Sequence, residues 1–335
     1  QFNWSFDNIA PTISKVNLLS DNSGVEVELS EVSFSQSNGS GGLEVSDFQF
    51  SITGGTATLS SSTPSGISKN GNIYSLSINL SGTPDGSEEL TVSLVANSAY
   101  DAIGNVLSIN NSKTISLNDQ TKPVIGGINF AADNSYADIN FSVPVYANNN
   151  GTGALELSDF LIEFNQSSGT ATAASMTSIK KNDSANEANA TSLTGGESVV
   201  RIFISITGIP NGMEELTIKP KNASSIFDLS GNSADNNVAS ISSKFQDRFS
   251  PTISFSPANN SDQIKLDSLI IITFSESVRQ LNDAEITNNN VGSLVSLNRQ
   301  EPDGPSLDFA ATINSNKKII TIDPAQDFSF NEKIY

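Results

Sequence analysis

Cysteine and histidine are both absent from this chain of 335 residues. Their absence excludes a disulfide framework, Ser-His-Asp and Cys-His nucleophiles, and zinc or iron sites held by His or Cys. The groups that remain for acid–base or metal chemistry are mainly carboxylates. The lack of cysteine does not assign a compartment, because exported and cytosolic proteins can both do without it.

Long apolar runs are missing as well. No run approaches the roughly 18 residues that a membrane helix needs, so we expect no membrane insertion within this segment. Gln1 is not the basic start of a signal peptide, and a secretion signal would lie outside this chain. Charged residues make up only 16%, and Ser, Asn, Thr and Gly, which favour turns and half-exposed strands over helices, take their place.

The charge that is present is mostly negative. There are 36 Asp and Glu residues against 17 Lys and Arg, which gives a formal net charge of −19. Nucleic acids and anionic membranes are bound through basic patches, so we expect neither as a partner. An acidic surface does suit divalent cations.

An internal repeat sets the organisation of the chain. The motif Asp-x-x-x-Pro opens three stretches, and the third keeps a Ser-Glu pair of the first but has no Asp-x-x-Gly-Asn. Four further blocks recur in the same order in the first two stretches: 38–48 with 150–160, 55–58 with 169–172, 82–91 with 208–217, and 101–105 with 228–232. We therefore predict the end of a preceding repeat and a linker at 1–10, repeats at 11–118 and 119–246, and an incomplete repeat at 247–335.

Each repeat has the pattern of an all-β fold. Residues 25–29, 74–80 and 90–94 alternate apolar and polar side chains, as half-buried antiparallel strands do. Denser apolar runs at 198–204 and 269–274 predict central strands. About seven short strands in roughly 110–130 residues predict an immunoglobulin-like β-sandwich, repeated end to end along the chain.

These motifs resemble those of bacterial Ig-like tandem-repeat proteins. The Asp-x-x-x-Pro openings, the Ser-Glu on the second strand and the Asp-x-x-Gly-Asn before the last strand carry the resemblance. Such repeats occur in very large surface adhesins, and the motif Ser-Asp-Phe at 46–48 followed by Gly-Gly-Thr-Ala-Thr at 54–58 is similar to that of Bacteroidetes-type gliding or attachment proteins. The resemblance implies an extracellular or cell-surface location and a part in adhesion, and it identifies the module rather than the protein that carries it.

The strand order of an Ig-like sandwich brings the entry segment and two loops to one pole. Calcium takes six to eight oxygen ligands, several of them carboxylates, and acidic residues of all three repeats fall at this pole. The second repeat has Val143 where the first has a glutamate, which weakens its site. The candidate calcium ligands are Asp7, Glu31, Asp47 and Asp101 in the first repeat, Asp119, Asp159 and Asp228 in the second, and Asp247 and Glu276 in the third.

A purely structural interpretation of the same residues stays open. Asp-x-x-x-Pro can be a turn whose Asp accepts backbone hydrogen bonds, and Asp-x-x-Gly-Asn can be a tight hairpin with Gly at positive φ. At the opposite pole, Glu88 and Glu89 follow Asp85 and Gly86, and we expect a solvated turn there. Residues 180–196 are a polar insertion in the second repeat, expected to form a surface loop or a hairpin extension.

The expected function is structural. We expect no enzyme, because paired-carboxylate catalysis needs a cleft and neighbouring repeats would block a site at each pole. The expectation is a semi-rigid stalk or spacer of a large extracellular adhesin or filament, in contact with neighbouring repeats of the same chain and stiffened by calcium. The alternative is an adhesive module that contacts glycans, surfaces or sister chains through its faces. Sugar binding needs an aromatic platform, and Trp4 is the one tryptophan of the sequence.

Overall fold

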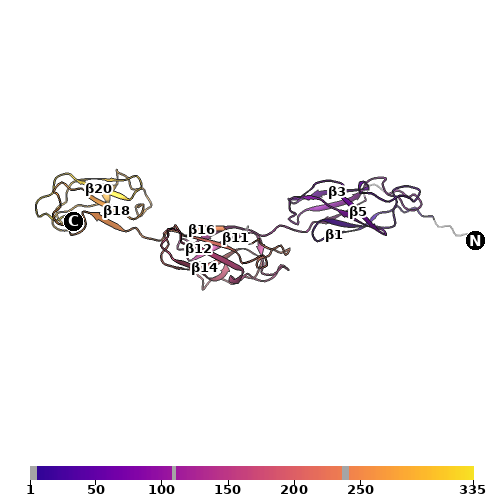
Figure 1. The fold of residues 1–335 in the computed structure, drawn as a ribbon, viewed down its shortest axis with the longest axis horizontal. Coiled ribbons are helices and arrows are strands. Elements are labelled where there is room, and N and C mark those ends of the chain that lie inside the picture. Colours follow the sequence, from indigo (N-terminus) through magenta and orange to yellow (C-terminus); the bar gives the residue numbers. More distant parts are fainter. Residues whose placement is uncertain (1–5, 108–110, 236–240) are drawn as a thin grey trace, which may run out of the picture. The chain divides into compact units, whose positions relative to one another are not determined.

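The computed structural model describes residues 6–107, 111–235 and 241–335 (Figure 1). Within these ranges the chain is all-β, as predicted, with antiparallel sheets and three short 3-10 helices. It divides into two compact units, Gln1–Asp247 and Arg248–Tyr335. No helix in the described ranges has the length and apolarity to span a bilayer. Trp4 and the start of the predicted segment 1–10 lie outside the described residues.

The first sandwich, as we call residues 13–117, pairs a four-stranded sheet with a three-stranded one. A two-stranded ribbon and a 3-10 helix complete it. In sheet order the strands are β1 (Ile13–Leu18), β2 (Gly24–Leu29), β6 (Ile73–Ser77) and β5 (Gly66–Asn70); β3 (Phe48–Thr53), β8 (Glu89–Leu94) and β9 (Ser112–Ser116); and β4 (Thr58–Leu59) with β7 (Leu80–Ser81), while η1 spans Val45–Asp47.

The core of the first sandwich lies between its two sheets. In β2 the alternate residues Val25, Val27 and Leu29 are buried, and the glutamates between them are exposed or half-buried. Residues of β6, β3 and β8 pack against them in one hydrophobic cluster, among them Tyr74 and Leu90. The period-two pattern of the sequence therefore places one face of each strand in this core.

The second sandwich, residues 125–245, repeats this strand order. In both sandwiches the first strand has a bulge at the same place, two residues after the proline of Asp-x-x-x-Pro. The run at 198–204 lies in β14, an inner strand, as predicted. The sheets are β10 (Ile125–Phe130), β11 (Tyr136–Val145), β14 (Glu197–Thr207) and β13 (Ala173–Lys181), and β12 (Phe160–Asn165), β15 (Glu215–Pro220) and β16 (Ile241–Lys244), with η2 at Leu157–Asp159.

The insertion of the second repeat forms a loop between β13 and β14 that is closed by its own hydrogen bonds. The backbone N–H of Lys181 donates to the carbonyl of Thr191 (2.9 Å), and the Asp183 carboxylate accepts from the N–H and the hydroxyl of Thr191. Ala190 and Leu193 are buried although most of their neighbours are exposed. Of the two predicted forms, the surface loop is the one observed, because residues 182–196 contain no strand.

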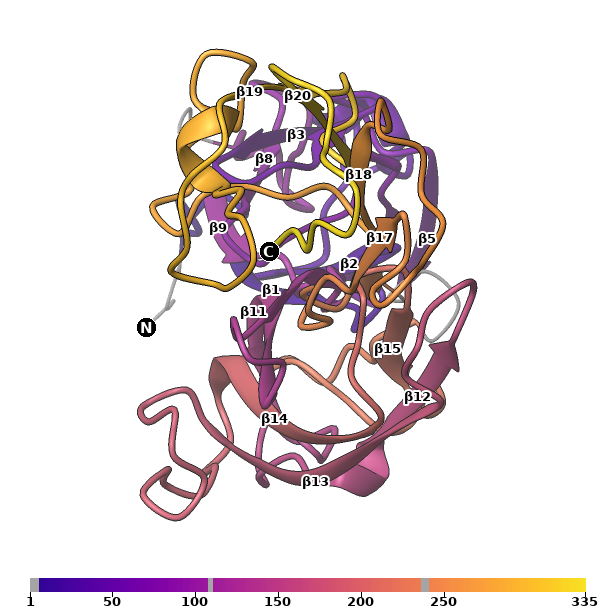
Figure 2. The ribbon, with the colours of Figure 1, turned by 90° about the vertical axis from the view of Figure 1, so that its left-hand side faces the viewer.

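The unit Arg248–Tyr335 contains one four-stranded sheet (Figure 2). Its strands, in sheet order, are β17 (Ile253–Ser256), β18 (Ile270–Phe274), β20 (Ile319–Pro324) and β19 (Phe309–Ile313), and η3 spans Val291–Leu294. β18 is an inner strand, as the run at 269–274 predicted. Within the described residues no three-stranded sheet faces it, and Ile253 is 54% exposed whereas Ile13 and Ile125, at the same place after their prolines, are 3% and 4% exposed.

The separate cores predict separate unfolding. Leu90 of β8 and Leu216 of β15 occupy matching positions, and each is fully buried in its own cluster. We expect Leu90→Ala to lower the unfolding free energy of the first sandwich by about 2–5 kcal/mol, because it leaves a cavity, and to spare the second. Leu216→Ala should do the reverse. Denaturant unfolding followed by amide hydrogen exchange checks this, and equal loss of protection in both sandwiches by either variant contradicts it.

Candidate metal centre

The loop at residues 101–105 is folded around the side chain of Asp101. Its Oδ1 accepts hydrogen bonds from the backbone N–H of Ile103 (2.9 Å) and Asn105 (2.7 Å), and its Oδ2 accepts from Asn105 Nδ2 (2.6 Å). Gly104 has φ of 94°, the left-handed conformation that glycine adopts without steric cost. Asp101 is 1% exposed, so this loop buries a carboxylate at the end of the sandwich.

Two further carboxylates lie beside Asp101. One oxygen each of Asp7, Glu31 and Asp101 lies within 4.8 Å of the others. Asp7 belongs to the entry segment, and its backbone carbonyl accepts from Asn105 Nδ2 (3.2 Å), while Glu31 follows β2. Residues nearly a hundred positions apart therefore meet at one pole, as the predicted strand order requires.

The electrostatics of this group are unbalanced. The pKa of Glu31 is raised above its ordinary value by burial and by repulsion from Asp101 and Asp7. Burial acts in the same direction on the pKa of Asp101, but hydrogen bonds from Asn105 and from the loop backbone outweigh it and lower that pKa. Within the described part of the chain none of the three carboxylates forms an ion pair with Lys or Arg.

The donor set fits a hard divalent cation. Oxygen ligands about 2.4 Å from one Ca²⁺ can be at most about 5 Å apart, and the three carboxylate oxygens lie within that span. Three carboxylates would leave three to five of calcium's oxygen positions to backbone carbonyls or water. A bound cation would also offset the repulsion that raises the pKa of Glu31.

Asp47 does not belong to this group. Its Oδ2 accepts from the backbone N–H of Glu44 (2.8 Å) at the start of η1, and its own N–H donates to the carbonyl of Glu44. Asp159 caps η2 in the same way with Glu156. The recurring Glu-x-x-Asp is thus a reciprocal cap of a short 3-10 helix.

The second repeat keeps the loop but not the third carboxylate. Asp228 accepts from the backbone N–H (2.8 Å) and Nδ2 (2.9 Å) of Asn232, and Asn232 Nδ2 also donates to the carbonyl of Asp119 (3.1 Å). Val143, half-buried in β11, stands in place of Glu31. In the described residues no group of three close carboxylates forms here, so this pole is a natural comparison for the first.

The candidates of the third repeat belong to different units. Asp247 ends the unit Gln1–Asp247 and lies against Gly212, whereas Glu276 follows β18 in the unit Arg248–Tyr335. Neither joins a group of three close carboxylates among the residues that the structure describes.

The expectation of a solvated turn at Glu88 is wrong. Its side chain is completely buried, and its carboxylate accepts backbone N–H bonds from Thr56 and Ala57 (both 2.9 Å) and from Asp85 and Gly86 (both 3.1 Å). Four donors thus replace the water that a buried carboxylate loses. We call this arrangement the glutamate-centred turn.

The glutamate-centred turn recurs along the chain. Glu214 is likewise fully buried and accepts from the backbone N–H of Ala171 (2.7 Å) and Asn211 (3.1 Å). In the other unit, Glu332 accepts from the N–H of Ser329 (2.7 Å) and forms an ion pair with Arg299. Each acceptor lies three residues after one of its donors.

A signal for these glutamates is present in the sequence. Glu88 of the first repeat corresponds to Glu214 of the second, although two other residues of the turn differ between the repeats: Asp85 corresponds to Asn211, and Ser87 to Met213. The Gly-Thr-Ala-Thr block also recurs in both repeats. Its glycine, Gly55 or Gly169, leaves room for the glutamate, because a Cβ there would lie within 2.2 Å of the glutamate's carboxyl carbon. Two blocks repeated together are the mark of two segments in contact.

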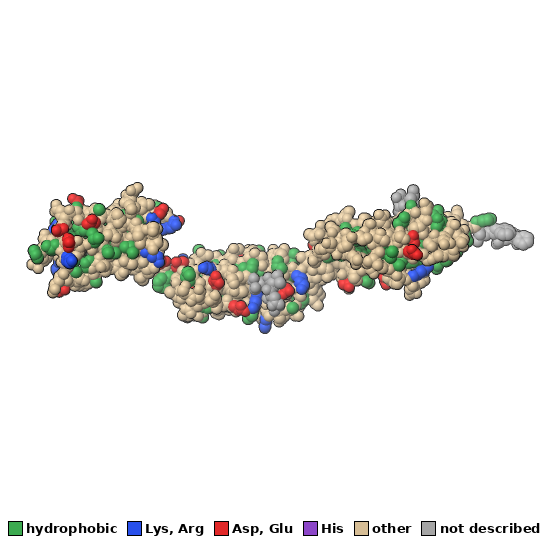
Figure 3. Space-filling model, turned by 45° about the horizontal axis from the view of Figure 1, so that its top comes forward, with side chains coloured by type: hydrophobic (Ala, Val, Ile, Leu, Met, Phe, Trp, Pro, Cys, Tyr) green, Lys and Arg blue, Asp and Glu red, His purple; other side chains and the backbone are tan. Residues whose placement is uncertain are grey.

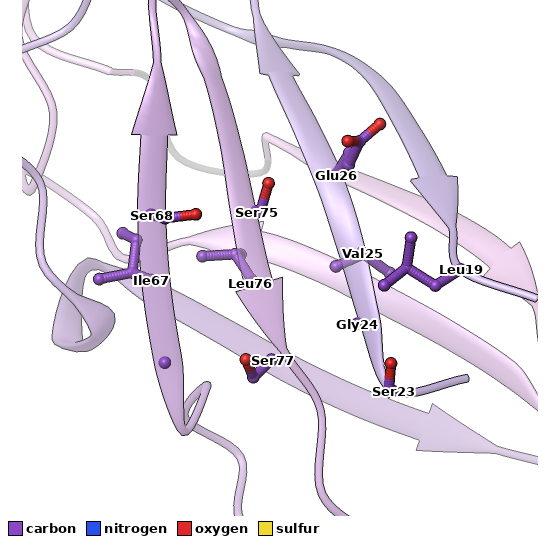
Figure 4. A pocket seen from close by; sticks show the side chains of 11 residues that line it. Leu19, Ser23, Gly24, Val25, Glu26, Ile67, Ser68, Ser75, Leu76 and Ser77 are labelled. Carbon is purple, nitrogen blue, oxygen red and sulfur yellow. The ribbon is translucent and has the colours of Figure 1, made fainter. Parts of the chain in front are cut away.

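A shallow groove of about 480 Å³ lies along β2, β6 and β5 (Figure 4). Serines 68, 75 and 77 line it together with Glu26, and none of its lining residues is aromatic. It therefore lacks both the stacking platform of a sugar site and a pair of carboxylates. On the face drawn in Figure 3, uncharged polar side chains and backbone predominate, and acidic and basic groups are scattered.

Comparison with known proteins adds no family. A scan against protein-family models finds no match to this chain, and a search of curated proteins finds no similar sequence.

The glutamate-centred turn makes stability depend on pH. Burial by itself raises the pKa of Glu88, but the backbone N–H groups outweigh it, and the pKa lies below its ordinary value of 4.5. The stabilising effect is therefore complete above that value and is lost as pH falls through the lower, folded-state pKa. We expect Glu88→Gln to cost about 1.5–3 kcal/mol at neutral pH.

The cost of Glu88→Gln should shrink as the pH falls below 4.5, because the carboxylate of the unfolded parent then binds a proton more readily than the folded one, whose pKa is lowered. Urea unfolding of parent and variant across this range measures it. Glu89→Gln, at the exposed neighbouring position, is the matched control and should change stability little. A Glu88→Gln cost that is the same at every pH contradicts the assignment.

Proposed function

We propose that this chain is a semi-rigid spacer segment of a large extracellular or cell-surface adhesin or filament, built from tandem Ig-like sandwiches. The observation that supports the proposal is repetition of the whole structural plan. Two sandwiches have the same strand order, the same bulge and the same glutamate-centred turn. Repetition of this kind lengthens a protein without adding a new site, because each unit is stabilised mainly by itself and its neighbours.

The core and the buried polar side chains of each sandwich also favour a mechanical role. Each has its own hydrophobic cluster between two antiparallel sheets. The two repeats share buried carboxylates whose oxygens accept hydrogen bonds from backbone and amide N–H groups. These are Asp101 and Glu88 in the first repeat and Asp228 and Glu214 in the second. These side chains stabilise loops, and a spacer needs stable loops more than reactive groups.

We further propose calcium as the cation for the pole of Asp7, Glu31 and Asp101. The support is the close approach of three carboxylates with no cationic side chain paired to them among the described residues. Asp7 lies in the segment that enters the sandwich, so a cation held here would tie that segment to two loops. The effect would be a stiffer entry to the first sandwich.

Stretching a single molecule tests the spacer role. We expect the first and second sandwiches to unfold in discrete, separate events that release at most roughly 370 Å and roughly 420 Å of chain, because they contain about 105 and about 121 residues at about 3.5 Å each. Leu90→Ala should lower the force of one event and leave the other unchanged. Extension at low force without discrete events contradicts the proposal, and specific binding to a glycan array by the intact chain would favour the adhesive role instead.

Calcium titration tests the metal centre. At a dissociation constant of 10⁻⁴–10⁻³ M, common in extracellular calcium modules, about 10 mM Ca²⁺ should stabilise the first sandwich by about 1.4–2.7 kcal/mol. Glu31→Gln should abolish this gain. In chelator at neutral pH the same variant should be more stable than the parent, because the raised pKa of Glu31 marks an ionised form that the fold disfavours.

The second sandwich supplies the matched control for calcium. Val143→Glu introduces a glutamate at the position that corresponds to Glu31, and we expect it to make the unfolding of the second sandwich calcium-dependent. Denaturant unfolding with and without calcium, resolved by amide hydrogen exchange, measures both sandwiches in one experiment. An unaltered chain with no calcium dependence removes the metal from the proposal and leaves the spacer role to the stretching test.

A further inference from the structure

The segment at residues 118–122, here called the connecting segment, leads from the first sandwich to the second. The backbone N–H of Gln120 (2.9 Å) and the hydroxyl of Thr121 (3.1 Å) both donate to the carbonyl of Pro84. Asn22, in the turn between β1 and β2, donates to the carbonyl of Asn118 (2.8 Å) and accepts from its N–H (2.9 Å). Side-chain amides add three more hydrogen bonds to the turn between β1 and β2: Asn118 Nδ2 donates to the carbonyl of Leu19 (3.1 Å) and to Asn22 Oδ1 (3.2 Å), and Gln120 Nε2 donates to the carbonyl of Ser20 (3.2 Å).

The same segment is bonded on its other side. The carbonyl of Asp119 accepts from Nδ2 of Asn232, and Asn232 is itself held by the carboxylate of Asp228. Asp119 Oδ1 accepts from the N–H of Thr121 (2.8 Å) and closes a local turn. The connecting segment is therefore tied within a few residues to loops of both sandwiches.

The bonds to Pro84 depend on the glutamate-centred turn. Pro84 immediately precedes Asp85 and Gly86, whose backbone N–H groups donate to the buried Glu88 carboxylate. Gly86, with φ of 82°, lies so close to Asp119 that a Cβ would come within 3.1 Å of the Asp119 Cβ. The carbonyl of Glu88 accepts from the N–H of Leu117 (2.9 Å), directly before the connecting segment.

We propose that Glu88 is a positioning residue for the connecting segment: by folding residues 84–87 around its carboxylate, it directs the Pro84 carbonyl at Gln120 and Thr121 and so restricts the orientation between the first two sandwiches. This joint needs no metal ion, in contrast to the calcium-held entry proposed for the first sandwich. The inference holds whether or not the chain serves as a spacer.

Spin labels test the orientation directly. The chain has no cysteine, so Ser75→Cys in β6 and Ser198→Cys in β14, both exposed, give one labelled site in each sandwich. Pulsed EPR on the full chain then measures the distribution of distances between them. We expect Glu88→Gln to at least double the width of this distribution, and Thr121→Val, which removes one of the two bonds to Pro84, to widen it less.

Two variants separate this effect from lost stability. Glu89→Gln removes the same charge at the exposed neighbour, and Glu214→Gln removes the equivalent buried carboxylate from the second sandwich. Both should keep the parent width, in chelator as well as in calcium. A folded Glu88→Gln chain with the parent width overturns the proposal. Where Glu88→Gln fails to fold, Thr121→Val decides: a widened distribution supports the proposal and an unchanged one overturns it.

Discussion

The sandwiches depend on buried carboxylates that accept backbone N–H groups. A charge inside a protein is costly unless hydrogen bonds replace its hydration, and Glu88 obtains four such bonds from two turns that are distant in sequence. The carboxylate thus joins the residues after β3 to the turn before β8. Glu214 does the same between the residues after β12 and the turn before β15. This single type of contact decides the shape of one pole in both sandwiches.

The opposite pole of the first sandwich also folds a loop around a buried carboxylate, Asp101, but two further carboxylates lie beside it and no Lys or Arg of the described residues pairs with them. Asp101 and Asp228 each fold a five-residue loop through the same bonds to Asn105 and Asn232, and each asparagine reaches on to the entry segment of its own sandwich. This pole differs between the two sandwiches at one position. Glu31 adds a third carboxylate in the first sandwich, and Val143 takes its place in the second. One substitution between repeats therefore changes the chemistry of a pole while its hydrogen-bonded loop stays the same.

Local patterns predicted strands well and turns poorly. The alternating run at 90–94 lies in β8, and the denser run at 198–204 lies in the inner strand β14, because period and apolar density report directly which faces are buried. The turn before β8 was expected to be solvated because Asp-Gly-Ser-Glu is typical of an exposed turn, but Glu88 is buried. Its burial comes from Thr56 and Ala57, about thirty residues earlier, which local composition does not reveal.

The sequence by itself determined the all-β class, the repeated plan and the set of acidic residues gathered at the poles, because strand periodicity and motif recurrence are properties of the chain alone. Only the tertiary structure decided what each acidic residue does: Asp47 caps a 3-10 helix, Asp101 folds a loop, Glu88 is buried, and Asp7 and Glu31 lie beside Asp101. The physical reason is that a carboxylate's role depends on which N–H groups and charges surround it. Those neighbours come from segments that only the pairing of distant strands brings together.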